Sequence, residues 1–496
     1  MSAARRLVVL TAALSLFRLA SAVVVAQPGY TDAYYYADVA KRLAAGGGLT
    51  ADFVWNFLEA PGFAALPVAS HRFWMPLAST LQAIGIAGLP FLDAFRAAQA
   101  AELVLALFIP VVAYAAARSL EASRDQALVA AAIAGLGGAL APGWVSLDAF
   151  VPAALIGTAF FLCYRRAALG DIRFGVLSGI AVGVLFLARA EGALFGFALI
   201  GLLWSGTARR AGAAGSAVAL AIGLAWLARD LSLAPVADLL GRSALLVRYE
   251  DFFAVPPPTV DRFVAAIPAL IGTKVGALAT NLGTLLFVFG LLLVPGLVRA
   301  SRSGRDRADV RAFGALLLVV YLAESLVWTL HSTRGSYFHS LAAFFPFGCA
   351  LGVVGTSEWL RGSGPRRVAA IAGLAGAAIL SMFAVAQWDV AFNTPYRARL
   401  AALERIPPGP FAAVDAAAWR WIAGRPVIVT PADDRSFDCA LARYGAGSVV
   451  LEPAHFSEYD ALYKGTRMVS YLGSPAVVGE IKIFTVTAPP ACAAGQ

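Results

Sequence analysis

This sequence carries very little charge. Only 14% of its 496 residues are Asp, Glu, Lys or Arg, whereas an average soluble domain has about 25%. Hydrophobic residues make up 60% of the chain, and its mean hydropathy is +0.74. So few polar groups cannot cover so much apolar surface in water, which excludes a soluble enzyme for most of the length. Disorder is excluded as well, because it requires low hydrophobicity.

Several common sequence signals are also missing. The chain has only 4 cysteines and 4 histidines, and none of them stands at a zinc-binding spacing. There is no glycine-rich phosphate loop, internal repeat or low-complexity tract. The sequence therefore gives no sign of a zinc module, a P-loop nucleotide site or a repeat fold.

Long apolar runs bounded by charge are what the sequence does contain. A membrane helix needs roughly 20 mostly apolar residues. The runs at 174–188 and 192–206 are short and can also be one bent pair, so we expect about eleven spans within a range of ten to twelve. The eleven runs are 7–26, 93–117, 126–143, 149–164, 174–188, 192–206, 212–228, 275–298, 312–330, 339–357 and 368–388.

The arginines predict the orientation of these spans. A net charge of +9 and an isoelectric point of 9.6 would also suit a nucleic-acid-binding protein. With a cytoplasmic N-terminus, however, 17 of the 39 basic residues fall in short cytoplasmic loops, each holding at least two. This is the positive-inside pattern, so we expect a multi-pass plasma (inner) membrane protein and no nucleic-acid partner. The 17 residues are Arg5, Arg6, Arg118, Arg124, Arg165, Arg166, Arg173, Arg209, Arg210, Arg299, Arg302, Arg305, Arg307, Arg311, Arg361, Arg366 and Arg367.

The first run leaves one alternative, a signal peptide cleaved after Val24-Val25-Ala26. The run is long for a signal peptide and Arg18 interrupts it, which favours a membrane span.

An odd number of spans places the C-terminus outside the cell. The expected fold is an all-α polytopic membrane domain, residues 1–388, followed by a small extracytoplasmic α/β domain, residues 389–496. Strands are expected at 426–430 and 448–452. Cys439 and Cys492 both fall on the side where disulfides persist, so they are a candidate disulfide pair.

The first outer loop, residues 27–92, begins with an acid at the start of a predicted helix. Residues 33–45 have helical periodicity with Lys and Arg on one face, the pattern of an amphipathic interfacial helix. Asp32 lies at its N-terminus, where a structural helix cap is the alternative to a functional role. Tyr35, His71 and Trp74 of the same loop are candidate substrate-binding residues.

A second acid, Asp148, follows the third span, and a helix start is again the structural alternative. Acids are scarce within the apolar runs. Arg18 and Glu102 lie at similar depth in their spans and have opposite charge, which predicts a structural ion pair, since charges in lipid need partners.

Basic residues at the outer ends of spans form a third group: Arg189, Arg229, Arg248 and Arg334. Snorkelling to headgroups accounts for any one of them, but four on the outer side oppose the positive-inside bias. The planar guanidinium suits phosphate, so together they predict an anion site beside carboxylates. Glu191, Tyr337 and His339 lie next to them in the sequence and complete the candidate substrate site.

The order of these parts resembles the GT-C superfamily of membrane glycosyltransferases, which includes protein mannosyltransferases, the lipid A aminoarabinose transferase and oligosaccharyltransferases. A first span leads to an outer Asp, an amphipathic helix and AAGGG; FWMPL follows. DAFRAAQAAELVLALFIPVVAYAAARSL is similar to the second span of the family, SLDAF to its second outer loop, and GIAVGVLFLARAEG to its glycine-rich span.

The resemblance implies roles for three residues. Asp32 would be the catalytic base or lie beside it, Asp148 would be the acid of the second outer loop, and Arg189 would contact the carrier phosphate. Two departures matter: Ala33 replaces the Glu that often follows the first Asp, and Trp419-Arg420-Trp421 stands in place of a Trp-Trp-Asp-Tyr-Gly signature. The second departure favours transfer of a single sugar.

The resulting hypothesis is transfer of a sugar from a polyprenyl-phosphate donor to a protein, lipid or glycan acceptor at the outer face of the membrane. Asp32 would take the acceptor proton, which implies inversion. Asp148 would either orient the acceptor or hold a divalent cation such as Mg²⁺ or Mn²⁺. The alternatives are an oligosaccharide transferase or ligase, a transporter or lipid flippase, and an envelope scaffold.

Overall fold

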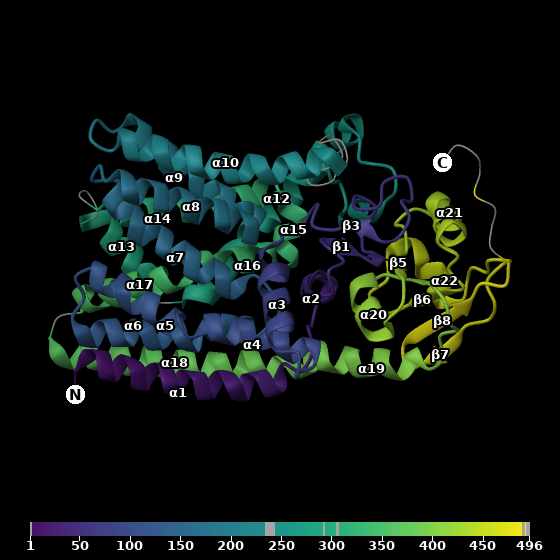
Figure 1. The fold of residues 1–496 in the computed structure, drawn as a ribbon, viewed down its shortest axis with the longest axis horizontal. Coiled ribbons are helices and arrows are strands. Elements are labelled where there is room, and N and C mark those ends of the chain that lie inside the picture. The colour runs from purple at the N-terminus through teal and green to yellow at the C-terminus, as the bar shows by residue number, and fades with distance from the viewer. Residues whose placement is uncertain are drawn as a thin grey trace.

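The computed structural model describes residues 2–233, 244–290, 293–303, 307–360, 362–488 and 492. Arg305 and Arg361 of the predicted cytoplasmic set lie outside these residues. Long helices run side by side along the longest axis, with the N-terminus at one end and a lobe of short strands and helices at the other (Figure 1).

The bundle consists of helices that are apolar over most of their surface. Helix α1 lies beside α18 along one edge of the bundle, and α10 lies at the opposite edge (Figure 1). The principal helices are α1 (Ala3–Val24), α4 (Ala94–Ala106), α5 (Ile109–Ser119), α6 (Arg124–Leu136), α7 (Phe150–Ala167), α8 (Ile172–Ala188), α10 (Arg209–Leu233), α12 (Val260–Phe289), α13 (Leu293–Ser303), α14 (Ala308–Leu326), α17 (Phe345–Trp359) and α18 (Ser363–Trp388).

Six of the described helices are long and apolar enough to cross a membrane by length and composition, or seven if the bent pair 124–136 and 138–144 forms one span. These helices identify a membrane protein. The other expected runs fall in helices that are shorter, bent or less apolar, so the count of eleven stays a prediction, as do the inner membrane and the orientation. The predicted run 192–206 is broken into η2 (Ala190–Phe195), α9 (Gly196–Gly201) and η3 (Leu202–Trp204).

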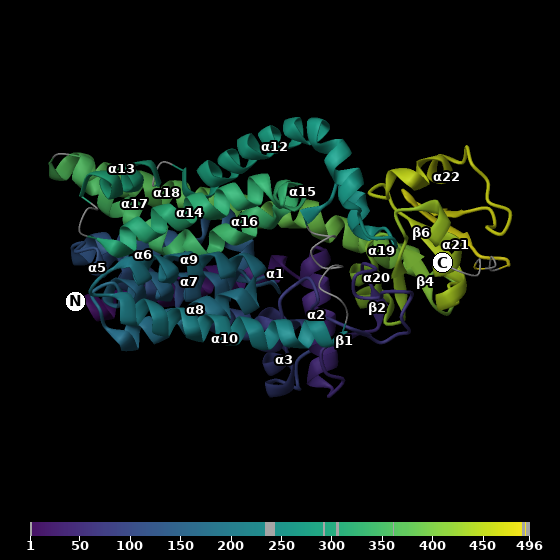
Figure 2. The same cartoon turned by 90° about the horizontal axis from the view of Figure 1, so that it is seen from above.

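Helix α12 curves along the outside of the bundle towards the lobe (Figure 2). Pro268 lies inside this helix and accounts for a bend, because proline removes a backbone hydrogen bond.

Small residues allow α8 and α10 to approach closely. A Cβ atom at Gly175 would lie 2.3 Å from the Ala211 carbonyl oxygen, and one at Gly179 would lie 2.2 Å from that of Gly215. Contacts of this kind replace hydrophobic burial as the source of helix pairing in lipid. Since α8 ends at Arg189, this packing also fixes where that arginine enters the outer region.

We therefore expect Gly179→Leu to separate α8 from α10 and to lower the apparent unfolding temperature of the purified protein in detergent. Overpacking of this kind costs about 1–3 kcal/mol. Gly223→Leu, on α10 where nothing lies within 4 Å of a new Cβ, is the matched control and should leave the midpoint unchanged. Equal midpoints for the two variants would contradict the close packing.

The first outer loop packs between the bundle and the lobe. It holds α2 (Thr31–Ala44), α3 (Leu77–Gly88) and the short strands β1 (Thr50–Ala51), β2 (Phe53–Val54) and β3 (Val68–Ala69). The expected helix at 33–45 is present, but it does not lie at an interface with one face in water. Residues Ala33–Ala40 are all buried, and Asp38 faces Arg420 of the lobe at 3.6 Å. The polar face of the helix was expected in water, but an acid can be buried when it is paired with an arginine of the lobe. Helical periodicity alone does not reveal such a partner.

A buried carboxyl organises the middle of this loop. The Glu59 Oε1 atom accepts hydrogen bonds from the Tyr35 hydroxyl at 2.7 Å and from the Arg72 backbone N–H at 3.1 Å. The His71 backbone N–H in turn donates to the Tyr35 oxygen. Burial raises the pKa of Glu59 to about 7, although these hydrogen bonds oppose the rise. Tyr35 and His71 are thus structural parts of this loop.

Because its pKa is raised in the folded protein, the protonated form of Glu59 is compatible with the folded state and the carboxylate is not. The contribution of this group to the free energy of unfolding is therefore fully present below pH 4.5 and is lost as the pH rises towards 7. We expect Glu59→Gln to match the wild type at pH 5 and to unfold roughly 2–5 °C higher at pH 8. Thermal scans at both pH values test this. Glu404→Gln, at an exposed carboxyl, is the control and should show no such pH dependence. A variant destabilised equally at both pH values would refute the assignment.

The lobe contains a six-stranded sheet in the order β2-β5-β4-β6-β8-β7. Strands β5 (Val427–Val429) and β6 (Ser448–Leu451) occupy the two expected positions; the others from this region are β4 (Phe411–Ala413), β7 (Ala476–Val478) and β8 (Ile481–Thr485). Helices α20 (Ala416–Ala423), α21 (Asp434–Tyr444) and α22 (Asp460–Lys464) pack around it. The edge strand β2 comes from the first outer loop and pairs in parallel with β5.

No break in the chain separates the bundle from the lobe at residue 388. Helix α18 continues through η8 (Asp389–Asn393) into α19 (Thr394–Leu403), giving one helical element from Ser363 to Leu403. The predicted boundary of 388/389 therefore falls inside a helix.

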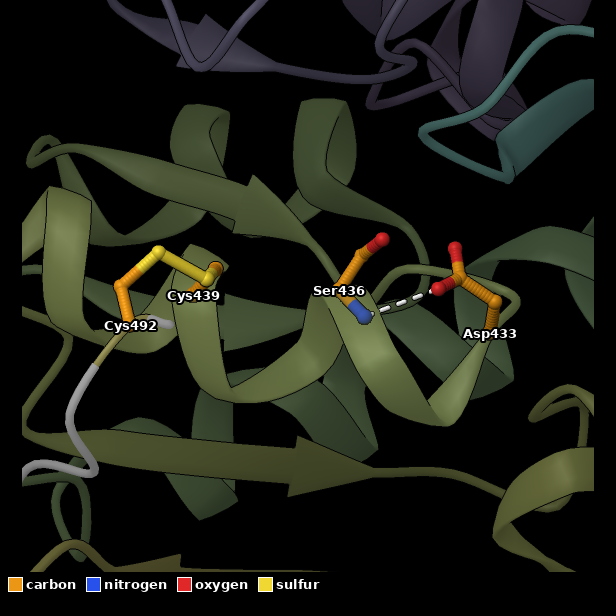
Figure 3. Close-up of a disulfide and its surroundings, with 4 residues drawn as sticks. All are labelled: Asp433, Ser436, Cys439 and Cys492. Carbon is orange, nitrogen blue, oxygen red and sulfur yellow. Dashed lines mark hydrogen bonds between the residues drawn. A yellow bond between two sulfur atoms is a disulfide. The ribbon is translucent and has the colours of Figure 1, made fainter. Parts of the chain in front are cut away.

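The candidate disulfide is formed. Cys439 on α21 is bonded to Cys492, with Cα atoms 4.5 Å apart, and the Ser436 backbone N–H donates to Asp433, which caps the same helix (Figure 3).

The predicted Arg18–Glu102 ion pair is not formed. Arg18 donates to the Gly135 carbonyl oxygen at 3.0 Å, near the end of α6, and the Glu102 carboxyl has no hydrogen-bond partner among the described residues. Equal depth in the membrane does not place two side chains on facing sides of their helices, which is why the prediction was wrong.

Candidate active site

A cavity of about 1120 Å³ lies where the bundle meets the lobe. Its lining comes from both parts and from the first outer loop. Among the predicted site residues it includes Asp32, Trp74, Arg189, Glu191, Arg334 and His339.

Asp32, Asp148 and His339 converge from three separate segments. One ligand atom from each lies within 4.8 Å of the other two. The first turn of α2 carries Asp32, the turn before α7 carries Asp148, and α16 (Tyr337–Ser340) carries His339. The Tyr30 hydroxyl donates to Asp148 Oδ2 at 2.6 Å, and His339 Nδ1 lies 3.2 Å from the same oxygen.

The chain reaches His339 through a π-helical turn at Ser332–Ser336. Gly335 takes a φ of 119° there, a left-handed conformation that glycine adopts without strain. This irregularity turns Arg334, Ser336 and His339 towards the cavity, and such π-helical turns are frequent at functional sites.

The two aspartates differ in protonation because their surroundings differ. Burial raises the pKa of Asp32 to about 6, since the nearby His339 only partly opposes it. Burial also acts on Asp148, but His339, Arg189 and the Tyr30 hydrogen bond outweigh it and hold the pKa of Asp148 below its ordinary value. Asp148 is therefore a stable anion, whereas Asp32 can exchange a proton near neutral pH, as a general base must.

The same three side chains could hold a divalent cation. Two carboxylates and an imidazole supply hard oxygen ligands and one nitrogen, and His339 Nδ1 already lies 3.2 Å from Asp148 Oδ2. Carboxylates suit Mg²⁺ and Mn²⁺ alike, but an imidazole ligand favours Mn²⁺. A cation here would stabilise negative charge developing beside Asp32.

Arg189 lies next to this cluster, at the end of α8. Its Nη2 atom donates to Glu191 Oε1 at 3.0 Å and to Ser336 Oγ at 3.3 Å. Burial raises the pKa of Glu191, but the Arg189 guanidinium outweighs it and holds this pKa below its usual range. Arg334 lies farther along the wall, 3.6 Å from the centre of the Tyr249 ring and 3.9 Å from Glu250.

Two of the four predicted phosphate-binding arginines lie outside the cavity lining that the described residues form. Arg229 Nη2 donates to the Ser70 carbonyl oxygen at 2.7 Å and so ties α10 to the first outer loop. Arg248 bonds Glu458 at 3.1 Å and so ties the segment before α12 to the lobe. Both arginines thus have protein partners in the described structure, and their predicted contact with a phosphate stays a prediction.

Tyr35, His71 and Tyr337 are also buried away from the cavity. Trp74 does reach it and stacks on Trp55, with ring centres 3.7 Å apart.

The lobe contributes cavity residues that the sequence did not reveal. Arg399 of α19 binds Glu452 through two nitrogens, at 2.7 and 3.0 Å, and Asp415 at 3.1 Å, and all three line the cavity. They are far apart in the sequence, and no local motif links them. Tyr30 was also missed, although its place two residues before Asp32 was a usable signal.

The fold is shared with solved membrane glycosyltransferases. No family model and no curated protein sequence matches the chain. ArnT from Cupriavidus metallidurans, solved with undecaprenyl phosphate, is 15% identical over 99% of both chains, with a TM-score of 0.60. AglB from Archaeoglobus fulgidus, an oligosaccharyltransferase solved with an inhibitory peptide and dolichol phosphate, is 12% identical over 91% of this chain and 70% of its own, with a TM-score of 0.52.

The archaeal enzyme has also been solved with Zn and sulfate, at 13% identity over 90% of this chain and 68% of its own, with a TM-score of 0.50. ArnT and AglB are both GT-C glycosyltransferases, so the fold that the sequence resemblance implied is confirmed.

We expect Mn²⁺ to bind the purified protein at one site, because Asp32, Asp148 and His339 offer three convergent ligand atoms. Titration calorimetry should show Asp148→Asn and His339→Ala weakening this binding by about tenfold or more. His455→Gln, whose imidazole contacts Asp460, is the control. Undiminished Mn²⁺ binding in His339→Ala would rule out this ligand set.

Proposed function

We propose that this protein transfers a single sugar from a polyprenyl-phosphate donor to an acceptor at the outer face of the plasma membrane. The observation that carries the proposal is one cavity lined by Asp32, His339 and Arg189, with the buried Asp148 beside Asp32, in the fold of ArnT and AglB. Both of those proteins were solved with a polyprenyl phosphate. The acceptor is a protein, lipid or glycan hydroxyl.

The donor phosphate would bind Arg189 and Arg334, the two predicted arginines that line the cavity. Arginine matches phosphate through paired N–H donors. The apolar tail would lie against the apolar part of the cavity lining, which includes Phe186, Trp226 and Trp388. Arg229 and Arg248 are not assigned to the phosphate, because they do not line the cavity formed by the described residues.

Transfer would proceed by direct displacement. The acceptor oxygen attacks C1 of the sugar, its proton passes to Asp32, and the C1–O bond breaks with its electron pair going to the phosphate. Attack from the face opposite the phosphate inverts C1. Because phosphate is a good leaving group, this reaction needs a base and charge stabilisation but no general acid. Asp148 would orient the acceptor, or hold a divalent cation together with Asp32 and His339.

An oligosaccharide donor remains the second candidate, and AglB supports it through the shared fold. A transporter would require its polar groups near the middle of the membrane. The gathering of Asp32, Arg189 and Arg334 around one cavity beside the lobe instead favours a transferase.

We expect Asp32→Asn and Asp32→Ala to lower transfer by about 100-fold or more, because a positioned base contributes about 10²–10⁴ in rate. A deletion strain should accumulate the lipid-linked sugar, and its extracted and radiolabelled donor provides the substrate for the purified variants. Asp93→Asn is the control, since Asp93 is an exposed helix cap of α4, directly after the same loop, and Asn caps equally well.

Full transfer by Asp32→Asn would show that Asp32 is not the base. A deletion strain with unchanged lipid-linked sugars would count against the donor class itself.

A further inference from the structure

A second pair of acids, Glu191 and Glu324, lies near Arg189, and the transfer step above uses neither of them. Glu324 of α14 has no exposed surface, and Glu191 is its neighbour at the cavity wall. Ser336 lies between them: its Oγ atom is 2.8 Å from Glu191 Oε1 and 3.0 Å from Glu324 Oε1. A third oxygen, the Ser340 hydroxyl, lies 3.1 Å from the same Glu324 atom.

Counting protons shows that the two acids cannot both be ionised without strong repulsion. The Ser336 hydroxyl has one proton, which can satisfy only one carboxylate oxygen. Glu191 is the better acceptor, because it is closer and already accepts from Arg189. Glu324 Oε1 then faces the lone pairs of Ser336 Oγ at 3.0 Å. Its one other hydroxyl neighbour in the described structure, Ser340, is equally close to the Ser336 carbonyl oxygen, at 3.1 Å, and Glu324 Oε2 has no donor among the described residues.

A proton on Glu324 resolves this arrangement. The carboxylic acid donates to Ser336 Oγ, Ser336 donates to Glu191, and the Glu191 carboxylate holds Arg189. Two buried carboxylates in one site cannot both keep their charge when only one cation balances them. The cluster is then neutral, with one arginine and one carboxylate.

We propose that Glu324 is a neutral carboxylic acid that positions Arg189 for the donor phosphate, acting through Ser336 and Glu191. The inference rests on the proposed function, because it requires the phosphate to bind Arg189. Arg189 Nε is buried and has no partner among the described residues, while Nη2 is held by Glu191, and the residue lines the cavity. An ionised Glu324 would instead add a negative charge behind the phosphate subsite and weaken it.

The test is binding of undecaprenyl phosphate to the full-length protein in lipid nanodiscs, followed by the fluorescence of the cavity tryptophans or by native mass spectrometry. Glu324→Ala and Ser336→Ala should each weaken binding about tenfold, because each breaks the chain that orients Arg189. Glu324→Gln should bind within about twofold of wild type, since an uncharged amide also donates to Ser336. Ser325→Ala, the adjacent buried serine outside the chain, should bind as the wild type does.

A second measurement addresses the proton directly. The infrared difference spectrum between wild type and Glu324→Gln at neutral pH should contain the carbonyl band of a protonated carboxylic acid. A carboxylate band in its place would overturn the proposal, as would Glu324→Gln binding as weakly as Glu324→Ala. Wild-type binding by both Glu324→Ala and Ser336→Ala would also overturn it.

Binding to Arg189→Ala distinguishes a failure of the positioning role from a failure of the proposed function. If it weakens binding while Glu324→Ala does not, only the positioning role fails. If undecaprenyl phosphate binds equally well to Arg189→Ala, the phosphate assignment in the proposed function fails.

Discussion

The positive charge of Arg189 is the interaction on which the cavity depends. It is the common counter-charge of Glu191, Asp148 and Asp32, all of which are buried or partly buried acids. Several carboxylates in a water-poor site repel one another and lose their charge unless a cation compensates them. The position of Arg189 follows from the end of α8, which the close packing against α10 holds in place. Helix packing inside the membrane thus determines the electrostatics of the outer cavity.

The arrangement also explains how two aspartates of one cluster can have different tasks. Asp148 has a hydroxyl donor and a histidine directly beside it, whereas Asp32 has weaker compensation. One remains an anion and the other accepts a proton. Their separate segments meet because α2 is held between α3 and the lobe helix α20, so the lobe contributes to the placement of the base.

Much of this organisation was predictable from the sequence. The apolar runs, the acid at the start of an outer helix and the arginine closing a glycine-rich span led to Asp32, Asp148 and Arg189, because each stands out in a local pattern. Pairings across helices were not predictable in this way. Arg18 and Glu102 lie at a similar predicted depth in their helices, but their side chains do not face each other. Arg229 and Arg248 bind protein groups from segments that are distant in the sequence. Glu324 was missed although an acid within an apolar run is itself a signal.

The pairing of β2 with β5 has a consequence for biosynthesis. Phe53 and Val54 belong to the loop that carries Asp32, yet they pair with Val427 and Ile428, which leave the ribosome more than 370 residues later. The loop can reach its final form only after nearly the whole chain has been synthesised. A nascent chain therefore has no assembled cavity until its synthesis is almost complete.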